Sequence, residues 1–200
     1  MQNNGTSKDF IHGIRFFIFL MLMAVVGVFA GVICCKMGIN LFSHSFFSAE
    51  SFLKMREDKA FAGILFSSFG STSAFVIVAF VLGFSAIAQP FEVIIPLLKG
   101  VMLGVLAAQI YMQSQQHGIL ICLCLVVPCG IVSMYAVVSS AREAVGLSNI
   151  ILTNTLTLGH TSGLRETVKL YAVKFLVLEA VTAVSAAVDC LCTLVFVGRI

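Results

Sequence analysis

The sequence predicts an all-α fold: a polytopic integral membrane helix bundle of about five spans, one of them broken or re-entrant. Hydrophobic residues make up 60% of the chain and charged residues 10%, whereas soluble domains are about half apolar and about a quarter charged. The mean hydropathy is +1.07, so polar side chains are too few to coat a water-soluble globule. Long uncharged stretches separated by short polar segments predict a single transmembrane domain covering residues 1–200.

The first predicted span covers residues 16–35, which carry no charge and are long enough to cross about 30 Å of hydrocarbon. Within it, Gly27 and Gly31 form a Gly-x-x-x-Gly pair, a spacing that permits close helix packing. We expect this helix to be retained, with a cleaved signal peptide as the alternative. The next segment, 36–59, is the most polar part of the chain and mixes charges with phenylalanines. It predicts an amphipathic helix on the membrane surface or a solvated loop.

The second and third spans are predicted at 68–88 and 91–112. Residues 60–91 carry no charge and exceed the length of one span, so we expect an interfacial lead-in before residue 68. The third stretch is apolar but is interrupted by Pro90, Glu92, Pro96, Lys99 and Gly100. Such interruptions are typical of a broken or re-entrant helix that is shielded by protein or lines a cavity. Gly100 and Gly104 would provide a smooth packing face.

The fourth span is predicted at 119–140, with a kink at Pro128, and the last span at 171–197. Between them, residues 143–169 mix threonines with leucines and isoleucines, which favours an interfacial helix bounded by turns at Gly159 and Gly163. With the N-terminus inside, the inner side would hold seven lysines and arginines, Lys99 among them, and the outer side five. This excess favours that orientation.

Ionisable residues inside the spans are the candidate functional residues, because each costs about 2.5–3.5 kcal/mol to insert at the bilayer centre. Glu179 in the last span therefore needs a partner, a proton or a wet cavity. It is either an ion or substrate contact, or a packing contact to Lys99 or His117. Asp189 lies ten residues further on, about 15 Å along the helix axis, and belongs to another depth.

Glu92 and Lys99 are seven residues apart, about two helical turns, and so share a face. An ion pair that ties the broken helix to its surroundings is one interpretation, and the lining of a transport pathway is the other. His117-Gly118 follows the polar run 113–116 and is expected at a turn between two apolar segments. There a histidine is more commonly a hydrogen-bonded turn residue than a metal ligand or catalyst.

No motif of catalysis or cofactor binding occurs in the chain: there is no Gly-x-Ser-x-Gly, no His-Glu-x-x-His and no P-loop. We therefore expect no enzyme activity, no cofactor and no metal. The seven cysteines lie in apolar runs without Cys-x-x-Cys spacing, which indicates small apolar side chains rather than zinc ligands or a disulfide framework. A net charge of +3 is too weak and dispersed for a nucleic-acid partner. Membrane lipid is the expected partner.

Two stretches together resemble the stage II sporulation protein M family of polytopic bacterial membrane proteins. The first is Pro96-Leu97-Leu98-Lys99-Gly100-Val101-Met102-Leu103-Gly104, followed by His117-Gly118-Ile119-Leu120, and the second is Leu178-Glu179-Ala180. The family has a similar length, about five spans, a His-Gly turn and often a membrane-embedded glutamate. Many members carry an acidic residue three positions after the glycine of that turn, where this chain has Ile121.

The resemblance implies a non-catalytic protein of the bacterial cytoplasmic membrane that acts in endospore formation. It would anchor or organise two peptidoglycan hydrolases during engulfment of the forespore, with the polar segment 36–59 as a docking surface. The alternative is a small transporter or permease subunit that uses the broken helix at 90–112 and Glu179.

Overall fold

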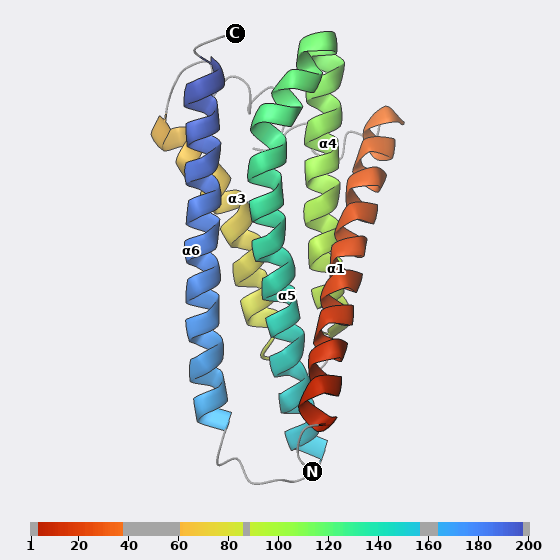
Figure 1. Cartoon of the computed structure of the whole chain (residues 1–200), viewed down its shortest axis with the longest axis vertical. Helices are drawn as coiled ribbons and strands as arrows, with labels where there is room; N and C mark the ends of the chain where they lie inside the picture. Colours follow the sequence, from red (N-terminus) through yellow and green to blue (C-terminus); the bar gives the residue numbers. More distant parts are fainter. Residues whose placement is uncertain (1–3, 38–60, 86–88, 157–163, 198–200) are drawn as a thin grey trace.

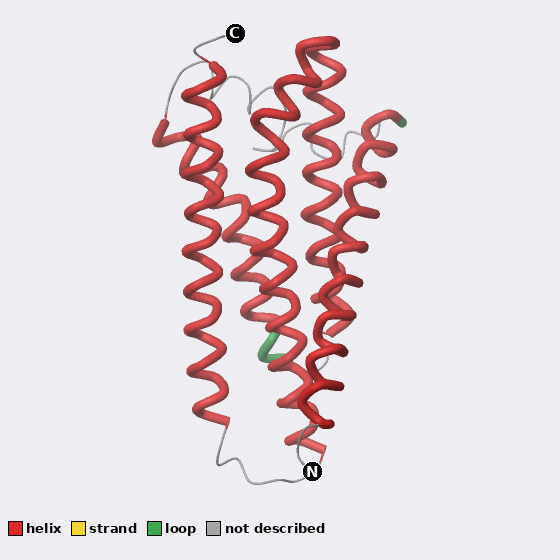
Figure 2. The backbone as a smooth tube through the Cα atoms, viewed as in Figure 1, coloured by secondary structure: helices red, strands yellow, loops and turns green. Residues whose placement is uncertain are grey.

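The computed structural model describes residues 4–37, 61–85, 89–156 and 164–197. Of these residues 97% are helical and none lies in a strand, which confirms the all-α class (Figure 2). Most of the predicted polar segment 36–59 lies outside the described residues. An apolar chain in lipid must satisfy its backbone hydrogen bonds within each segment, which is why these stretches form helices.

Within the described residues, six helical elements follow one another and pass up and down the bundle (Figure 1). They are α1 (Asn4–Lys36), α3 (Phe61–Leu82), α4 (Gln89–Ile121), the short π-helix η1 (Cys122–Val126), α5 (Val127–Leu156) and α6 (Leu164–Val197). The α1 helix packs mainly on α4 at one edge, and α6 packs on α3 and α5 at the other. The α5 helix contacts every other element and forms the centre of the bundle.

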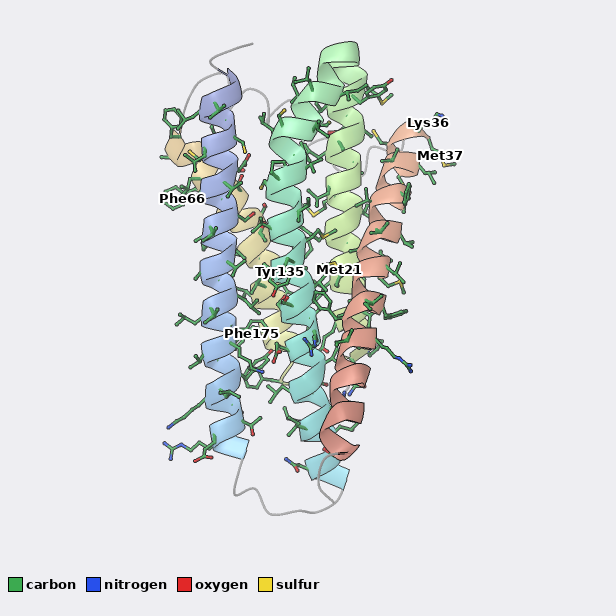
Figure 3. The ribbon with its side chains drawn as sticks, in the orientation of Figure 1. Met21, Lys36, Met37, Phe66, Tyr135 and Phe175 are labelled. Carbon is green, nitrogen blue, oxygen red and sulfur yellow. The ribbon has the colours of Figure 1, made fainter. Side chains whose placement is uncertain are left out.

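Five stretches of helix are long and apolar enough to cross a membrane: Gly13–Lys36, Phe61–Leu82, Gln89–Met112, Gly118–Asn154 and Arg165–Val195. Their outer faces are apolar, and Phe66 on α3 and Leu176 on α6 are each 72% exposed. Figure 3 shows Phe66 turned away from the bundle and Phe175 turned into it. The protein is therefore a multi-pass membrane protein whose exposed apolar surface is suited to lipid.

The second span begins earlier than predicted, at Phe61 rather than residue 68, and ends at Leu82. The predicted lead-in is therefore part of the same helix, and Ser71 further along it donates back to the Ser68 carbonyl at 3.0 Å. The helix ends where Gly83 meets α5 and α6. A Cβ at Gly83 would lie 3.1 Å from the Cα of Ala144, so only glycine fits there without a shift.

The predicted break in 90–112 is wrong, because α4 runs as one helix through Pro96 and Gly100. Proline removes a single hydrogen bond, the one to the carbonyl of Glu92 four residues earlier, and crowds that carbonyl. Glu92 lies in the first turn of α4, so the loss falls near the helix end. Close packing against α1 along the following two turns holds the helix in place.

A kink is predicted at Pro128 in the fourth span. The irregularity found in that span is the π-helix η1, just before Pro128. The Val127 N–H bonds to the Cys122 carbonyl, five residues back. A wider turn of this kind accommodates a proline that cannot donate to the carbonyl four residues earlier. The separate interfacial helix predicted at 143–169 is wrong, since α5 continues to Leu156. The Thr153 hydroxyl bonds back to the carbonyls of Asn149 and Ile150 and so stays satisfied within the helix.

Among the described residues, the apolar core has three clusters. One joins α3, α4, α5 and α6 and contains the aromatic rings of Tyr171 and Phe175, whose centroids are 4.5 Å apart. A second joins α1 to α5 through Leu20, Ala24, Val138 and Ala141. The third lies where α4 meets the start of the fourth span.

Candidate functional site: a buried polar seam

The position of α4 is set by its contact with α1, where two Gly-x-x-x-Gly pairs face each other. A Cβ on Gly27 would lie 3.2 Å from the Cα of Gly100, and one on Gly31 would lie 3.0 Å from the amide nitrogen of Val105. A Cβ on Gly104 would lie 3.1 Å from the Cα of Val28. The two backbones are thus in direct contact, as small residues at this spacing allow. This contact turns the opposite face of α4 toward α3, α5 and α6.

That inner face carries the acidic residue and the lysine of α4, Glu92 and Lys99. Lys99 is only 5% exposed, and its Nζ donates a hydrogen bond of 3.1 Å to the Thr72 hydroxyl on α3. Its Nζ also lies 5.5 Å from the centroid of the Phe75 ring, a cation–π contact that favours a charged ammonium.

The next residue of α3 after Thr72, Ser73, contacts Glu179 on α6. The Ser73 hydroxyl donates to one carboxylate oxygen at 3.0 Å, and the Thr182 hydroxyl lies 3.0 Å from the other. Because Thr72 and Ser73 are neighbours in sequence, α3 connects the ammonium of Lys99 with the carboxylate of Glu179. The Thr182 hydroxyl also lies 2.8 Å from the Glu179 backbone carbonyl.

Polar contacts continue along α6 toward the end of the bundle at which α6 finishes. The Ser185 hydroxyl donates to the Cys129 carbonyl on α5 at 3.1 Å, and Ser68 on α3 donates to the carboxylate of Asp189. Asp189 is only 1% exposed. We call this set of contacting residues the polar seam: Ser68, Thr72, Ser73, Lys99, Cys129, Glu179, Thr182, Ser185, Asp189 and Thr193.

The polar seam follows one face of α6, because its members there recur every three or four residues from Glu179 to Thr193. Fourteen residues of α-helix rise about 21 Å, which is most of the hydrocarbon thickness. This spacing was readable in the sequence. The sequence analysis considers Glu179 and Asp189 one at a time, and it does not predict the hydroxyl residues that lie on the same face of the helix.

Glu92 differs from every other buried polar residue of the bundle. Its side chain is 0% exposed, and neither carboxyl oxygen has a hydrogen-bond partner in the part of the chain that the structure describes. The phenol of Tyr171 on α6 is close enough to interact with it electrostatically. That phenol donates its own hydrogen to the Phe80 carbonyl at 3.0 Å and so is not a donor to Glu92.

Three interpretations of these residues change with the structure. An ion pair that ties this helix to its surroundings is not what the described residues show at Glu92 or Lys99, because Lys99 bonds to Thr72 on α3 and Glu92 has no hydrogen-bond partner there. Glu179 bonds to Ser73 and Thr182 rather than to Lys99. Lys99 is also not a loop charge, since it lies inside the bundle, and the inner side then holds six lysines and arginines against five.

His117 and Gly118 lie in the last part of α4, after the membrane-spanning stretch Gln89–Met112. At the upper end of the bundle in Figure 1 the chain turns from α4 back into η1 and α5. A Cβ on Gly118 would lie 2.9 Å from the Ile110 carbonyl oxygen and 3.0 Å from the Cα of Tyr111. Only glycine permits this approach without a shift. The His117 side chain lies outside the described part of the structure.

The seven cysteines are free thiols and partly buried. Among the described residues, no group of three or more histidine, cysteine, aspartate or glutamate side chains is placed to hold a metal ion. Comparisons with protein families, with curated proteins and with solved structures find no match for this chain.

Proposed function

We propose that the protein is a non-catalytic membrane protein of the stage II sporulation protein M type, located in the bacterial cytoplasmic membrane. It would anchor or organise peptidoglycan hydrolases during forespore engulfment. The observation that carries the proposal is the placement of the residues behind the resemblance. Gly100 and Gly104 let α4 pack directly on α1, and Gly118 makes the close approach to Ile110 and Tyr111. Glu179 accepts a hydrogen bond from Ser73 inside the bundle.

Docking would take place at the end of the bundle where α1 finishes. Met37, at the start of the polar segment 36–59, is 71% exposed there, and Figure 3 shows it beyond the packed helices. With the N-terminus inside, this end faces the peptidoglycan. The five spans occupy most of the chain, so a partner must bind the short connections or the outer helix faces.

Site-specific photo-crosslinking in sporulating cells tests this proposal. A crosslinking amino acid at Met37 is expected to capture peptidoglycan hydrolases. The matched control is the same amino acid at Gly146, an open position in the half of α5 after Ser140, toward the opposite end of the bundle. Capture of no hydrolase at Met37, or equal capture at both positions, contradicts the proposal.

A second candidate function, a small transporter or permease subunit, is favoured by one specific observation. The polar seam extends over about 21 Å of the bundle interior, and buried ionisable groups in membrane helices commonly mark ion or substrate pathways. The test is complementation of a deletion strain with Glu179→Gln, with Glu143→Gln, a partly exposed residue of α5, as the control. Full complementation by a folded Glu179→Gln protein contradicts this candidate.

A further inference from the structure

Sulfur-bearing side chains gather at the end of the bundle where α1 finishes. Cys34 and Cys35 directly precede Lys36, Met37 follows it, and Met112 ends the membrane-spanning stretch of α4. The Sγ atom of Cys35 lies 3.9 Å from the Sδ atom of Met112. The two helices therefore bring a thiol and a thioether, 77 residues apart in sequence, into direct contact.

This contact differs from those of the other thiols whose partners are described. Cys122 donates to the Ala107 carbonyl at 3.5 Å, and Cys129 lies 3.6 Å from the Ser185 hydroxyl. Both of these thiols contact oxygen atoms and are partly buried. The contact of Cys35 joins two sulfur atoms and is exposed, so a ligand can reach it from outside the bundle.

The glycine contact between α1 and α4 fixes the positions of the two sulfur atoms. Gly31 lies one turn before Cys35 on the same face of α1, and a Cβ on it would lie 3.0 Å from the amide nitrogen of Val105. Met112 lies two turns after Val105 on α4. The sulfur pair is thus carried by two helices in backbone contact, and rigid elements of this kind hold metal ligands in place.

The distance between the sulfur atoms suits a metal ion bound between them. A first-row metal ion lies about 2.3 Å from a sulfur ligand. An ion at that distance from both atoms would subtend an angle of about 116° across the 3.9 Å that separates them, which is close to the angle of trigonal coordination. No movement of either helix is needed to form such a site.

The chemistry of the two donors identifies the metal. Thiolate and thioether ligands favour monovalent copper, zinc and iron–sulfur clusters. Structural zinc sites use four ligands, and iron–sulfur clusters are held mainly by four cysteines. The described residues contain no cluster of three or more histidine, cysteine, aspartate or glutamate side chains that could supply these ligands. Monovalent copper, Cu(I), needs fewer ligands and accepts methionine.

We propose that Cys35 and Met112 form a binding site for one Cu(I) ion at this end of the bundle. On binding, the Cys35 thiol gives its proton to water, a copper–thiolate bond forms, and the Met112 thioether donates a lone pair. The charge of Cu(I) then cancels that of the thiolate, so the complex is neutral, which suits the edge of the hydrocarbon. Figure 3 shows Lys36 directed outward from the end of α1. The inference is independent of hydrolase docking.

The sequence predicts no metal site, because spacing along one segment cannot show that a cysteine meets a methionine of another helix. The signal that was available is the number of sulfur atoms that precede or follow the ends of these two spans.

The first measurement is competition for Cu(I) between the whole protein in mild detergent and the chelator bicinchoninate, without oxygen. We expect one tightly bound Cu(I) ion per chain. Loss of an outer-shell partner already costs about 10–100-fold in metal affinity, so Cys35→Ser and Met112→Leu should each weaken binding by at least about tenfold. Cys122→Ser and Met102→Leu are the matched controls and should leave the affinity unchanged. Absence of tight binding by the wild-type protein, unchanged affinity in Cys35→Ser or Met112→Leu, or an equal loss in the controls overturns the proposal.

The second measurement uses the unaltered chain and so does not depend on the folding of a variant. The protein is treated with a maleimide in the presence and absence of Cu(I), and mass spectrometry identifies the modified cysteines. Cu(I) should protect Cys35 and leave the modification of Cys122 unchanged, and zinc should protect neither. Equal modification of Cys35 with and without Cu(I), or equal protection by zinc, overturns the proposal.

Discussion

The contact between α1 and α4 and the contact between α3 and α6 hold the same bundle together by different means. At the first, glycines bring two backbones together with no side chain between them. At the second, the hydroxyls of Ser68 and Ser73 reach across to carboxylates on α6. Lipid supplies no hydrophobic force between helices, so close packing and hydrogen bonds are the two available means. Added side-chain volume should therefore disrupt the α1–α4 contact, and loss of a hydrogen-bond acceptor should weaken the α3–α6 contact.

The largest expected effect is that of a single methyl group at the glycine contact. Gly104→Ala would place a Cβ against the Val28 carbonyl of α1, and backbone cannot move aside as a side chain does. We expect a loss of about 3 kcal/mol in the free energy of unfolding, measured by titration from mild detergent into SDS and followed by circular dichroism.

Gly70→Ala is the matched control for that substitution. A Cβ at Gly70 on α3 meets nothing within 4 Å, so the change should be neutral or should stabilise by up to about 1 kcal/mol through better helix propensity. Equal effects at Gly104 and Gly70 would show that α1 and α4 are not in backbone contact.

Removal of an acceptor from the polar seam is expected to cost less. Glu179→Leu leaves the Ser73 hydroxyl without the acceptor it has at 3.0 Å, and an unsatisfied buried donor costs about 1–3 kcal/mol. The same detergent titration measures this loss. Ser73→Ala in the Glu179→Leu background should restore part of the stability, and no restoration would count against the hydrogen bond.

Glu92→Leu sharpens the contrast, because it removes a buried carboxyl that has no hydrogen bond to lose in the described structure. We expect a gain of about 1 kcal/mol in the free energy of unfolding, since the desolvation cost of the polar group disappears. Marked destabilisation in the same titration would reveal a partner for Glu92.

The smallest effect is expected at the exposed end of the bundle. Lys174→Met removes the ion pair to Glu143, whose side chains are 47% and 30% exposed, and exposed pairs contribute about 0–1 kcal/mol. The difference from wild type should vanish in high salt. A larger loss that persists in salt would place this pair among the interactions that hold the bundle.

The sequence was sufficient for the helical class and for the number of membrane-spanning helices, because length and hydropathy determine whether a segment can cross a bilayer. It misplaced the start of α3, since an uncharged stretch longer than one span carries no charge to mark where its helix begins. The partners of Lys99 and Glu179 could not be predicted, because both lie on α3, whose uncharged sequence gave no reason to expect them. The isolation of Glu92 is a property of the packed bundle alone.

The π-helix before Pro128 amounts to one extra residue inserted into an otherwise regular helix. Deleting any one residue of Cys122–Val126 would restore regular winding and rotate everything upstream by about 100°. The thiol of Cys122 would then turn away from the Ala107 carbonyl, 3.5 Å from it at present. Pro128, which has no backbone N–H, would then face a carbonyl to which it cannot donate a hydrogen bond. The fourth span therefore has a fixed residue count at this place.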